Sequence, residues 1–509
     1  MKPFTATIFL WIISILLYSQ NKIQWKIFDD NEGEYNFQSI FYVSEKGQKA
    51  IFTIPHNKLF RKTKHSIFVR NYNSDMTSYS ELGIPPESPQ LVSIKGFRDY
   101  NVILGSMDDN NTENNAVYSK DNKIVITDNE MNPLITKSFS LHNQHNRFKN
   151  LPEIIISSDS NYLIIVNSEL QNTQRLSLSY CPEIKYIDVY DKDLTHVWSD
   201  SIDSEIVFGR KLQVSDYNFN FFENQLIVTA SYEDMFYFKN NAEIFVAAFD
   251  KPQSFKILIK KEFPYEGLTY RTLFADSGKI IFSGYSFKCA TFSSTNPKRI
   301  LFYLSKDLKF PDAEPVYKYF KINSDFGKKF PNVKSSFKKN FVSPQRLFYK
   351  NNKLYYFNDW LVGTAYGSNT CEFGKIILMS FDMEGNIEWI KDIDKSVTII
   401  GLENEPVQYP NVFLTDNGLD IFYYDNIDNV NSNKLKPLRN GVKKLCLVNA
   451  KVAPNGDIIK SIIVNVGDEY VKPDLSMTKK INDNTYLFVG AGTTVTNKGD
   501  YSGFFRPEK

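Results

Sequence analysis

Basic residues gather in three segments of the sequence. The first contains Lys58, Arg61 and Lys62, the second contains Lys328, Lys329, Lys334, Lys338 and Lys339, and the third contains Lys434, Lys436 and Arg439. In the second segment phenylalanines such as Phe326 and Phe330 stand between the lysines. Ammonium and guanidinium groups bind carboxylate and phosphate. These residues are therefore candidate ligands for an acidic protein or an anionic glycan, and a solvated surface without a ligand is the alternative.

Catalytic signatures are missing from the sequence. It contains no His-Glu-x-x-His, Gly-x-Ser-x-Gly, P-loop or dinucleotide fingerprint. Residues 380 to 389 do not match the Ser-x-Asp-x-Gly-x-Thr-Trp box of sialidases. We therefore assign no catalytic residue and no cofactor, and favour a protein that is not an enzyme. A hydrolase or lyase that acts on polysaccharide, with carboxylates drawn from distant segments, is the alternative, and a structural envelope or adhesion component is a second.

Histidines and cysteines give no specific metal pattern. Four histidines stand in connections between expected strands and permit a metal site, but their spacing is that of polar surface residues: His56, His65, His142 and His145. We predict no metal ligand. The four cysteines form no C-x-x-C motif. Cys289–Cys371 is the one disulfide pairing that we propose, and isolated thiols are the favoured alternative.

The composition fits an exported all-β protein. Aromatic residues make up 15% of the 509 residues, charged residues 23%, and the formal net charge is +2. This balance excludes disorder and gives no global basic field for nucleic acid. Residues 1–19 resemble a signal peptide, because a basic residue, Lys2, is followed by a short apolar run and then by a small residue in the expected cleavage region. We expect residues 20–509 to form one secreted, periplasmic or cell-surface domain, a monomer without a transmembrane segment after signal removal.

A strand, a tight turn and a second strand recur along the chain. Asn and Gly accept the positive φ of short hairpin turns. The turn markers are spaced by 54 to 74 residues and are Gly47, Asn101, Asn161, Asn224, Gly278, Asn352, Gly418 and Asn484. Each hairpin is followed by a third strand and often by a fourth. The repeat predicts an all-β fold, a β-propeller of eight four-stranded antiparallel blades, with seven blades as the alternative.

The last repeat ends after three strands, and the N-terminus offers the fourth. Ile23 to Ile27 matches the fourth strand Ile387 to Lys391 in residue type and alternation. Pairing these ends would remove an exposed strand edge. We therefore predict that the N-terminal strand closes the blade that contains Asn484 and Phe505.

The repeat and the Gly-x-x-x-Trp segment at Gly385 to Trp389 resemble β-propellers of the quinoprotein and WD40 kind, and the chain is similar to exported propellers of Gram-negative bacteria. The resemblance extends over nearly all of the mature chain, but it concerns architecture alone. It implies no catalytic residue.

Connection lengths distinguish the two ends of the expected blades. Turns between first and second strands, and between third and fourth, are uniformly short. Connections between second and third strands and from blade to blade are longer, and they are 56–65, 107–120, 169–183, 231–242, 285–298, 359–374, 425–443 and 321–345. We name the end that carries these connections the long-loop face. Long connections in compact folds often carry function, so we place the acidic-ligand site there.

Overall fold

The chain folds into successive antiparallel sheets. The structure is a computed structural model, which describes residues 24–29, 38–44, 47–54, 66–72, 79–84, 90–98, 100–107, 121–128, 132–140, 153–170, 183–209, 214–232, 241–275, 278–288, 299–322, 324–330, 346–364, 370–400, 410–430, 438–439, 444–469, 471–482, 485–492 and 500–505. The chain divides into two compact units, residues 36–323 and residues 324–509 with 1–35. Each unit is described by itself.

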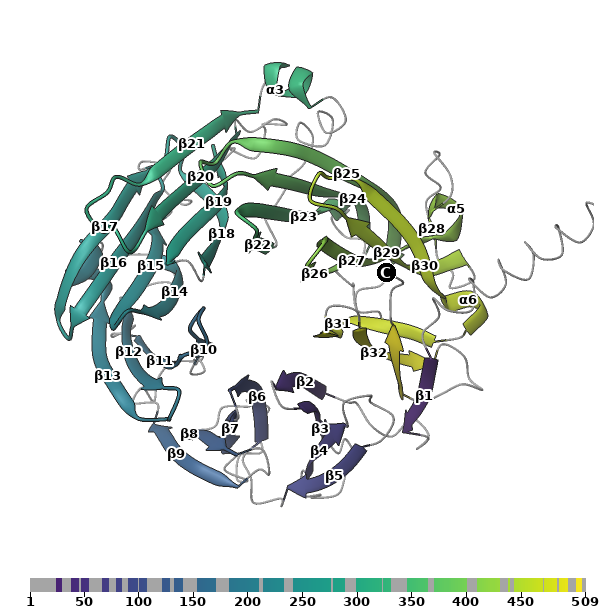
Figure 1. The fold of residues 1–509 in the computed structure, drawn as a ribbon, viewed down its shortest axis with the longest axis horizontal. Helices are drawn as coiled ribbons and strands as arrows, with labels where there is room; N and C mark the ends of the chain where they lie inside the picture. The colour runs from purple at the N-terminus through teal and green to yellow at the C-terminus, as the bar shows by residue number, and fades with distance from the viewer. Residues whose placement is uncertain are drawn as a thin grey trace, which may run out of the picture. The chain divides into compact units, whose positions relative to one another are not determined.

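The unit of residues 36–323 contains five four-stranded sheets in which each strand pairs with the next along the chain (Figure 1). Sheet 1 comprises β2 (Gln38–Ser44), β3 (Gly47–Ile54), β4 (Ser66–Tyr72) and β5 (Tyr79–Ile84). Sheet 2 comprises β6 (Gln90–Phe97), β7 (Tyr100–Met107), β8 (Asp121–Thr127) and β9 (Pro133–Ser140). Sheet 3 comprises β10 (Glu153–Ile156), β11 (Tyr162–Leu170), β12 (Glu183–Asp191) and β13 (His196–Asp203). Sheet 4 comprises β14 (Val214–Phe222), β15 (Gln225–Tyr232), β16 (Glu243–Lys251) and β17 (Ser254–Glu262). Sheet 5 comprises β18 (Gly267–Ala275), β19 (Lys279–Phe287), β20 (Arg299–Asp307) and β21 (Val316–Lys321).

The other unit contains three sheets. Sheet 6 comprises β22 (Arg346–Lys350), β23 (Lys353–Thr364), β24 (Thr370–Phe381), β25 (Ile387–Ile400) and β28 (Leu438–Arg439). Sheet 7 comprises β26 (Asn411–Thr415), β27 (Gly418–Asn426), β29 (Leu445–Val452) and β30 (Ile458–Asn465). Sheet 8 comprises β31 (Val471–Asn482), β32 (Thr485–Gly492), β33 (Asp500–Phe505) and β1 (Gln24–Asp29).

Four short helices lie in connections of the described chain: α2 (Ser204–Phe208), α3 (Ser324–Lys329), α5 (Ile427–Val430) and α6 (Val466–Glu469). No helix in the described part is long and apolar enough to cross a membrane.

The N-terminal strand completes sheet 8, as its sequence predicts. β1 pairs antiparallel with β33, with Gln24 opposite Phe504 and Ile27 opposite Tyr501. The two strands come from opposite ends of the chain and belong to one compact unit. The predicted pairing is therefore present, and the last sheet has four antiparallel strands, as the sheets other than sheet 6 do.

Four of the predicted turn markers have the positive φ that the sequence predicts, whereas at two other turns the positive φ falls on Arg98 and Ser160 instead of the predicted Asn101 and Asn161. Gly278 has φ +81° and Gly418 has φ +122°, and Asn224 and Asn352 also have positive φ. A side chain is tolerated poorly in this region, and Gly and Asn tolerate it best. These turns therefore hold the first two strands of sheets 4 to 7 in antiparallel register.

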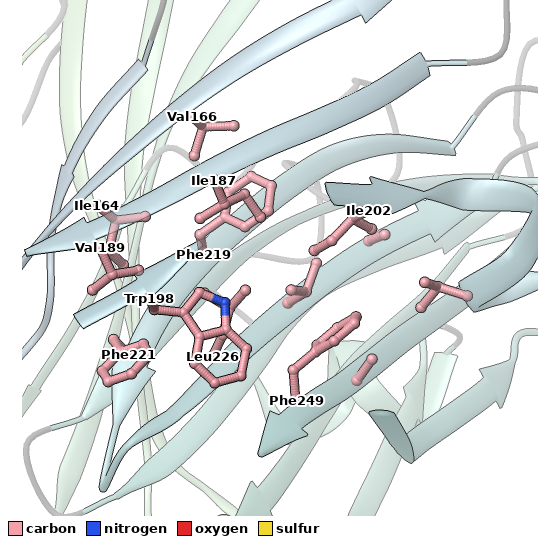
Figure 2. Packing of buried hydrophobic residues seen from close by; sticks show 14 of the residues in the cluster. Ile164, Val166, Ile187, Val189, Trp198, Ile202, Phe219, Phe221, Leu226 and Phe249 are labelled. Atoms are coloured by element: carbon pink, nitrogen blue, oxygen red, sulfur yellow. The ribbon is translucent and has the colours of Figure 1, made fainter. Parts of the chain in front are cut away.

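Successive sheets within a unit pack face to face, which makes the all-β fold propeller-like. Ile164, Val189 and Trp198 of sheet 3 pack against Phe219, Phe221, Leu226 and Phe249 of sheet 4 (Figure 2). Similar buried clusters join sheets 2 and 3, sheets 4 and 5, sheets 6 and 7, and sheets 7 and 8. Inner strands such as β19 and β27 bury side chains on both faces, because neighbouring sheets cover them, whereas the outer strands β17 and β21 are largely exposed.

Trp25, Trp198 and Trp389 alternate with polar neighbours in or near outer strands, and this pattern predicts that they are packing residues. Trp389 is 9% exposed in the core between sheets 6 and 7, and its Nε1 donates to the carbonyl of Pro454 at 3.0 Å. The packing role of Trp389 and of Trp198 is confirmed. The side chain of Trp25 lies outside the described part.

Sheet 6 departs from the predicted connections. The region 359–374 was expected to be a long connection, but β23 continues to Thr364 and β24 begins at Thr370. Register shifts near Leu361 and Phe373 let the pairing continue, and the added strand residues are mostly apolar or β-branched. The region 425–443 likewise contains the end of β27, α5 and β28. Tertiary pairing therefore orders parts of both segments that local pattern assigned to loops.

Candidate functional site

The helix α3 presents two of the predicted basic residues. Lys328 and Lys329 are exposed in its last turn. Phe326 is 8% exposed, and its ring lies 5.1 Å from that of Phe330. The Lys329 Nζ lies 5.5 Å from the centroid of Phe330. Phe326 therefore anchors the helix, whereas the two lysines face solvent. The alternation of lysine and phenylalanine that marked this segment in the sequence separates an exposed side from a buried one.

The third basic segment is fixed to the edge of sheet 6. β28 pairs in parallel with β25, with Leu438 opposite Val397 and Arg439 opposite Thr398. α5 lies in the same connection, where Asp428 forms an ion pair of 2.8 Å with Lys444. The structure thereby places the backbone of Arg439 beside the extended end of sheet 6.

α3 and β28 lie in the two classes of connection that define the long-loop face. α3 precedes β22, the first strand of sheet 6, and β28 lies between the second and third strands of sheet 7. In an antiparallel meander these two classes of connection emerge at the same end of the strands. By this order along the chain, both basic elements belong to long-loop connections.

Arg346 and Asn411 connect the first strands of three sheets. The Arg346 Nη1 of sheet 6 donates to Asn411 Oδ1 at 2.8 Å and to the carbonyl of Val412 at 3.2 Å. The Asn411 Nδ2 of sheet 7 donates to the carbonyls of Leu475 and Thr478 at 2.8 and 3.2 Å. These carbonyls lie in an irregular stretch of β31 in sheet 8. Because the buried side-chain amide of Asn411 donates to both carbonyls, these hydrogen bonds fix the bulged backbone of β31.

The guanidinium of Arg346 retains donors for a ligand. Residue 346 is solvent-exposed, and within the described chain its hydrogen bonds are those made by Nη1. Burial of part of the side chain lowers the pKa of Arg346, but arginine stays charged in proteins. Arg346 and Asn411 open their strands, so they lie at the long-loop face of their sheets. Nε and Nη2 can therefore bind a carboxylate or phosphate there.

One polar cluster contains the residue types of a hydrolytic triad in a different arrangement. On the outer strands of sheet 3, Ser199 Oγ donates to Asp188 Oδ1 at 2.6 Å, and His196 Nε2 lies 2.6 Å from the same Oγ. Lys137 of sheet 2 forms an ion pair of 2.5 Å with Asp188. A nucleophilic serine gives its proton to histidine, which the carboxylate orients. Here the serine proton is directed to Asp188, so the cluster ties two sheets together.

A buried polar group lies between sheets 6 and 7. Asp425 is 1% exposed and accepts a hydrogen bond of 2.8 Å from Asn429 Nδ2 of α5. Cys446 Sγ donates to the carbonyl of Asp425 at 3.4 Å. Burial, with a contribution from Asp425, raises the pKa of the Cys446 thiol well above its usual range. The thiol is free and buried, which makes it a packing residue.

The structure describes some of the predicted site residues. Lys328 and Lys329 are placed with their side chains, and Arg439 by its backbone. The predicted ligands Lys58, Arg61, Lys62, Lys334, Lys338, Lys339, Lys434 and Lys436 lie outside the described residues, as does Cys289. Cys371 stands opposite Thr364 and Ile399 in sheet 6, and its pairing with Cys289 stays a prediction. In the described ranges, no group of three or more His, Cys, Asp and Glu side chains is placed to hold a metal ion.

Sequence reasoning missed Arg346 and Asn411. Each is a polar residue at the start of the first strand of a sheet. This position is the only feature of the sequence that could have identified them. Their partners lie 64 to 67 residues further along the chain. The hydrogen bonds depend on how neighbouring sheets are placed, and local pattern does not determine that placement.

Comparison with known proteins gives weak structural likenesses. No family model matches the chain, and no curated protein matches it in sequence. A solved acylaminoacyl peptidase in complex with Z-Gly-Gly-Phe-chloromethyl ketone is 11% identical, with a TM-score of 0.39, over 90% of this chain and 58% of its own. This chain therefore spans less than two thirds of that protein.

Two further solved structures are similar over most of both chains. The WD40 domain of SCAP from fission yeast is 11% identical, with a TM-score of 0.37, over 95% of this chain and 98% of its own. The Trypanosoma rangeli sialidase in complex with sialic acid is 10% identical, with a TM-score of 0.27, over 96% of this chain and 95% of its own. TM-scores this low assign no substrate to this chain. Its architecture is defined by the topology of its own sheets.

Proposed function

We propose that the chain is an exported eight-bladed β-propeller, with β1 completing its last blade, that binds an acidic protein or an anionic glycan on its long-loop face. Binding without catalysis is the function that the site supports best. The observation that supports the proposal is that two predicted basic segments form ordered elements, α3 and β28, in long-loop connections.

The exposed lysines of α3 are suited to an anionic ligand. Lys328 and Lys329 lie side by side in the last turn, and the buried Phe326 holds the helix in place. A short helix anchored in this way loses little conformational freedom when a ligand binds, which favours affinity. The ligand would supply carboxylates or phosphates to these ammonium groups.

Arg346 adds a fixed cation to the same unit. Asn411 and the Val412 carbonyl orient its guanidinium, and the remaining N–H donors form the planar fork that carboxylate and phosphate fit. Two exposed lysine ammonium groups attract an anionic chain, whereas one oriented guanidinium would select the position of a single acidic group. We therefore assign long-range attraction to α3 and specificity to Arg346.

The eight-blade architecture is supported by the eight sheets of the described chain, by their face-to-face packing within each unit, and by the pairing of β1 with β33. Export and the resulting secreted, periplasmic or cell-surface location are proposed from residues 1–19. Mass spectrometry of protein recovered outside the cytoplasm would test this, since a mature N-terminus close to residue 20 is expected.

Charge substitution tests the binding proposal. We would measure binding of the full chain to polygalacturonate and to an acidic protein at two ionic strengths, and repeat it with Lys328→Ser/Lys329→Ser. The matched control is Lys192→Ser/Lys309→Ser, which removes the same charge from exposed turns between third and fourth strands. The α3 variant should bind at least about tenfold more weakly, and salt should weaken binding further. Equal binding by the α3 variant and the control would overturn the proposal.

Arg346 has its own test. Arg346→Lys keeps the charge but removes the planar fork, so attraction should persist while affinity for a defined acidic oligosaccharide falls. An unchanged affinity would remove Arg346 from the site and leave α3 unaffected.

A further inference from the structure

A second basic and aromatic surface lies on the outer strands of sheets 4 and 5. Tyr317, Tyr319 and Lys321 alternate along β21, so strand geometry places them on one side of that strand. Tyr317 packs against the core between sheets 4 and 5, and Lys261 of β17 faces it. We name the set Lys261, Tyr317, Tyr319 and Lys321 the outer strip.

The two tyrosine rings of the outer strip form a supported platform. Their centroids lie 6.0 Å apart, with 30° between the ring planes. Tyr317 also meets Phe263 edge-on at 6.0 Å and 77°. Tyr319 is 54% exposed, so its ring remains available to a ligand. Tyr317 therefore attaches the platform to the core, and Tyr319 is exposed to solvent.

The ammonium groups of the strip have no carboxylate partner within the described chain. Lys261 Nζ lies 4.0 Å from the centroid of Tyr317, and Lys321 is exposed at the end of β21. Two other lysines of outer strands form ion pairs: Lys137 of β9 with Asp188, and Lys256 of β17 with Asp312. Glu262, which follows Lys261, accepts a hydrogen bond from Asn241 and lies on the other face of β17.

We propose that the outer strip binds an acidic sugar, a pyranose that carries a carboxylate. The flat C–H face of the sugar ring stacks on Tyr319, and the carboxylate accepts hydrogen bonds from Lys261 or Lys321. An apolar platform beside unpaired ammonium groups matches a ligand with an apolar face and an anionic edge. This combination distinguishes a uronic acid from a neutral sugar, which has nothing to offer the lysines.

Charge argues against nucleic acid as the occupant. Nucleic-acid surfaces neutralise many phosphates in succession, whereas the strip has two lysines. The net charge of the chain, +2, adds no general attraction for a polyanion of that density. One or two acidic groups at a time fit the strip better.

The outer strip goes beyond the site on the long-loop face. Its four residues belong to the unit of residues 36–323, whereas Lys328, Arg346 and Arg439 belong to the other unit. Binding at the outer strip is therefore independent of binding at α3, and the two can be tested separately. Its ligand is a single sugar unit, recognised by stacking as well as by charge.

The test uses tetragalacturonate as the acidic probe, with neutral galactotetraose and oligothymidylate in parallel. Tyr319→Ala and Lys261→Ser should each weaken tetragalacturonate binding by about tenfold. Lys318→Ser is the control, since it removes a lysine from the opposite face of the same strand. Saturation-transfer NMR should show contact between sugar ring protons and the protein in the wild type, and Tyr319→Ala should lose it.

The outcomes separate the two sites. Loss of binding in Tyr319→Ala but not in Lys328→Ser/Lys329→Ser supports the strip, even if α3 binds nothing. Equal binding of galactotetraose and tetragalacturonate would overturn the acidic assignment. Tighter binding of oligothymidylate would overturn the sugar assignment. If Tyr319→Ala and Lys318→Ser bind tetragalacturonate alike, with both folded by circular dichroism, the strip is not a site.

Discussion

Tyr486 donates a hydrogen bond of 2.5 Å to Asp420 across the interface between sheets 7 and 8. The residues are 0% and 5% exposed. They hold corresponding places near the first turns of neighbouring sheets, 66 residues apart. Burial raises the pKa of Asp420, and the Tyr486 hydrogen bond and nearby lysines oppose the rise. The phenol therefore stabilises the ionised carboxylate inside the interface.

Removal of that phenol should destabilise the protein. Tyr486→Phe leaves the Asp420 carboxylate buried without its donor, which costs about 1–3 kcal/mol. Urea unfolding followed by tryptophan fluorescence measures this loss. Asp420→Asn keeps an acceptor for Tyr486 and removes the charge, so it should cost less at neutral pH. In Tyr486→Phe the pKa of Asp420 should rise further, and a rise in stability on acidification should follow. Equal stability of Tyr486→Phe and wild type would contradict this account.

The contribution of Asp188 to the stability of the fold should depend on pH in the opposite way. Burial alone would raise its pKa, but hydrogen bonds from Lys137 and Ser199 and the Lys137 charge outweigh burial and hold it below the usual value. A carboxyl whose pKa is lower in the folded chain than in the unfolded chain stabilises the fold at pH values above its unfolded pKa, which is near 4. This stabilisation is lost as the pH falls from the unfolded pKa to the folded pKa. Wild-type stability should therefore fall in this window more steeply than that of Asp188→Asn, in unfolding curves recorded from pH 5 to 2. Parallel curves would exclude the contribution.

Gly418 should tolerate no side chain. Its φ is +122°, and an added Cβ would lie 2.0 Å from the carbonyl oxygen of Val452 in the neighbouring strand. Gly418→Ala should therefore cost about 4 kcal/mol or more, in the range of severe single substitutions. Gly209→Ala is the matched control, since it also has positive φ but meets nothing within 4 Å. It should cost about 1 kcal/mol. Thermal unfolding of both variants gives the comparison, and similar losses would contradict the steric argument.

Deletion of residues 23–27 tests the role of β1. The deletion leaves the backbone groups of β33 unpaired along one edge. Loss of that strand should lower the stability by about 3 kcal/mol or more and promote association through the exposed edge. Calorimetry and light scattering measure the two effects. A synthetic peptide of residues 22–30 added to the truncated chain should restore part of the loss, whereas a scrambled peptide should not.

The elements of this fold could be predicted where residue type and turn chemistry determine them locally. Gly278, Gly418, Asn224 and Asn352 mark turns because positive φ favours these residues. The third strands were also predicted, for example Ser66–Tyr72, because apolar alternation follows each turn. The pairing of Ile23–Ile27 with the last sheet followed from an incomplete repeat.

The candidate site was less accessible from sequence. Thr370 pairs with Ile400 of β25, and Thr364 pairs with Cys371 of the same extended β24, so both residues were assigned to a loop by local pattern. Phe326 was noted only as a residue between lysines, and its burial follows from packing in the folded chain. Arg346 and Asn411 matter because sheets 6, 7 and 8 bring their first strands together. These features depend on neighbours more than 20 residues away, which a local pattern does not identify.

The pairing of β1 with β33 also has a consequence for the order of synthesis. The first strand that leaves the ribosome pairs with the last, so almost the entire chain must be made before β1 finds its partner. Until then its apolar, β-prone residues need shielding from other chains. Contacts this far apart in sequence form slowly. Sheet 8 should therefore be the last element to become protected in a refolding experiment, and its completion should set the rate at which the native protein accumulates.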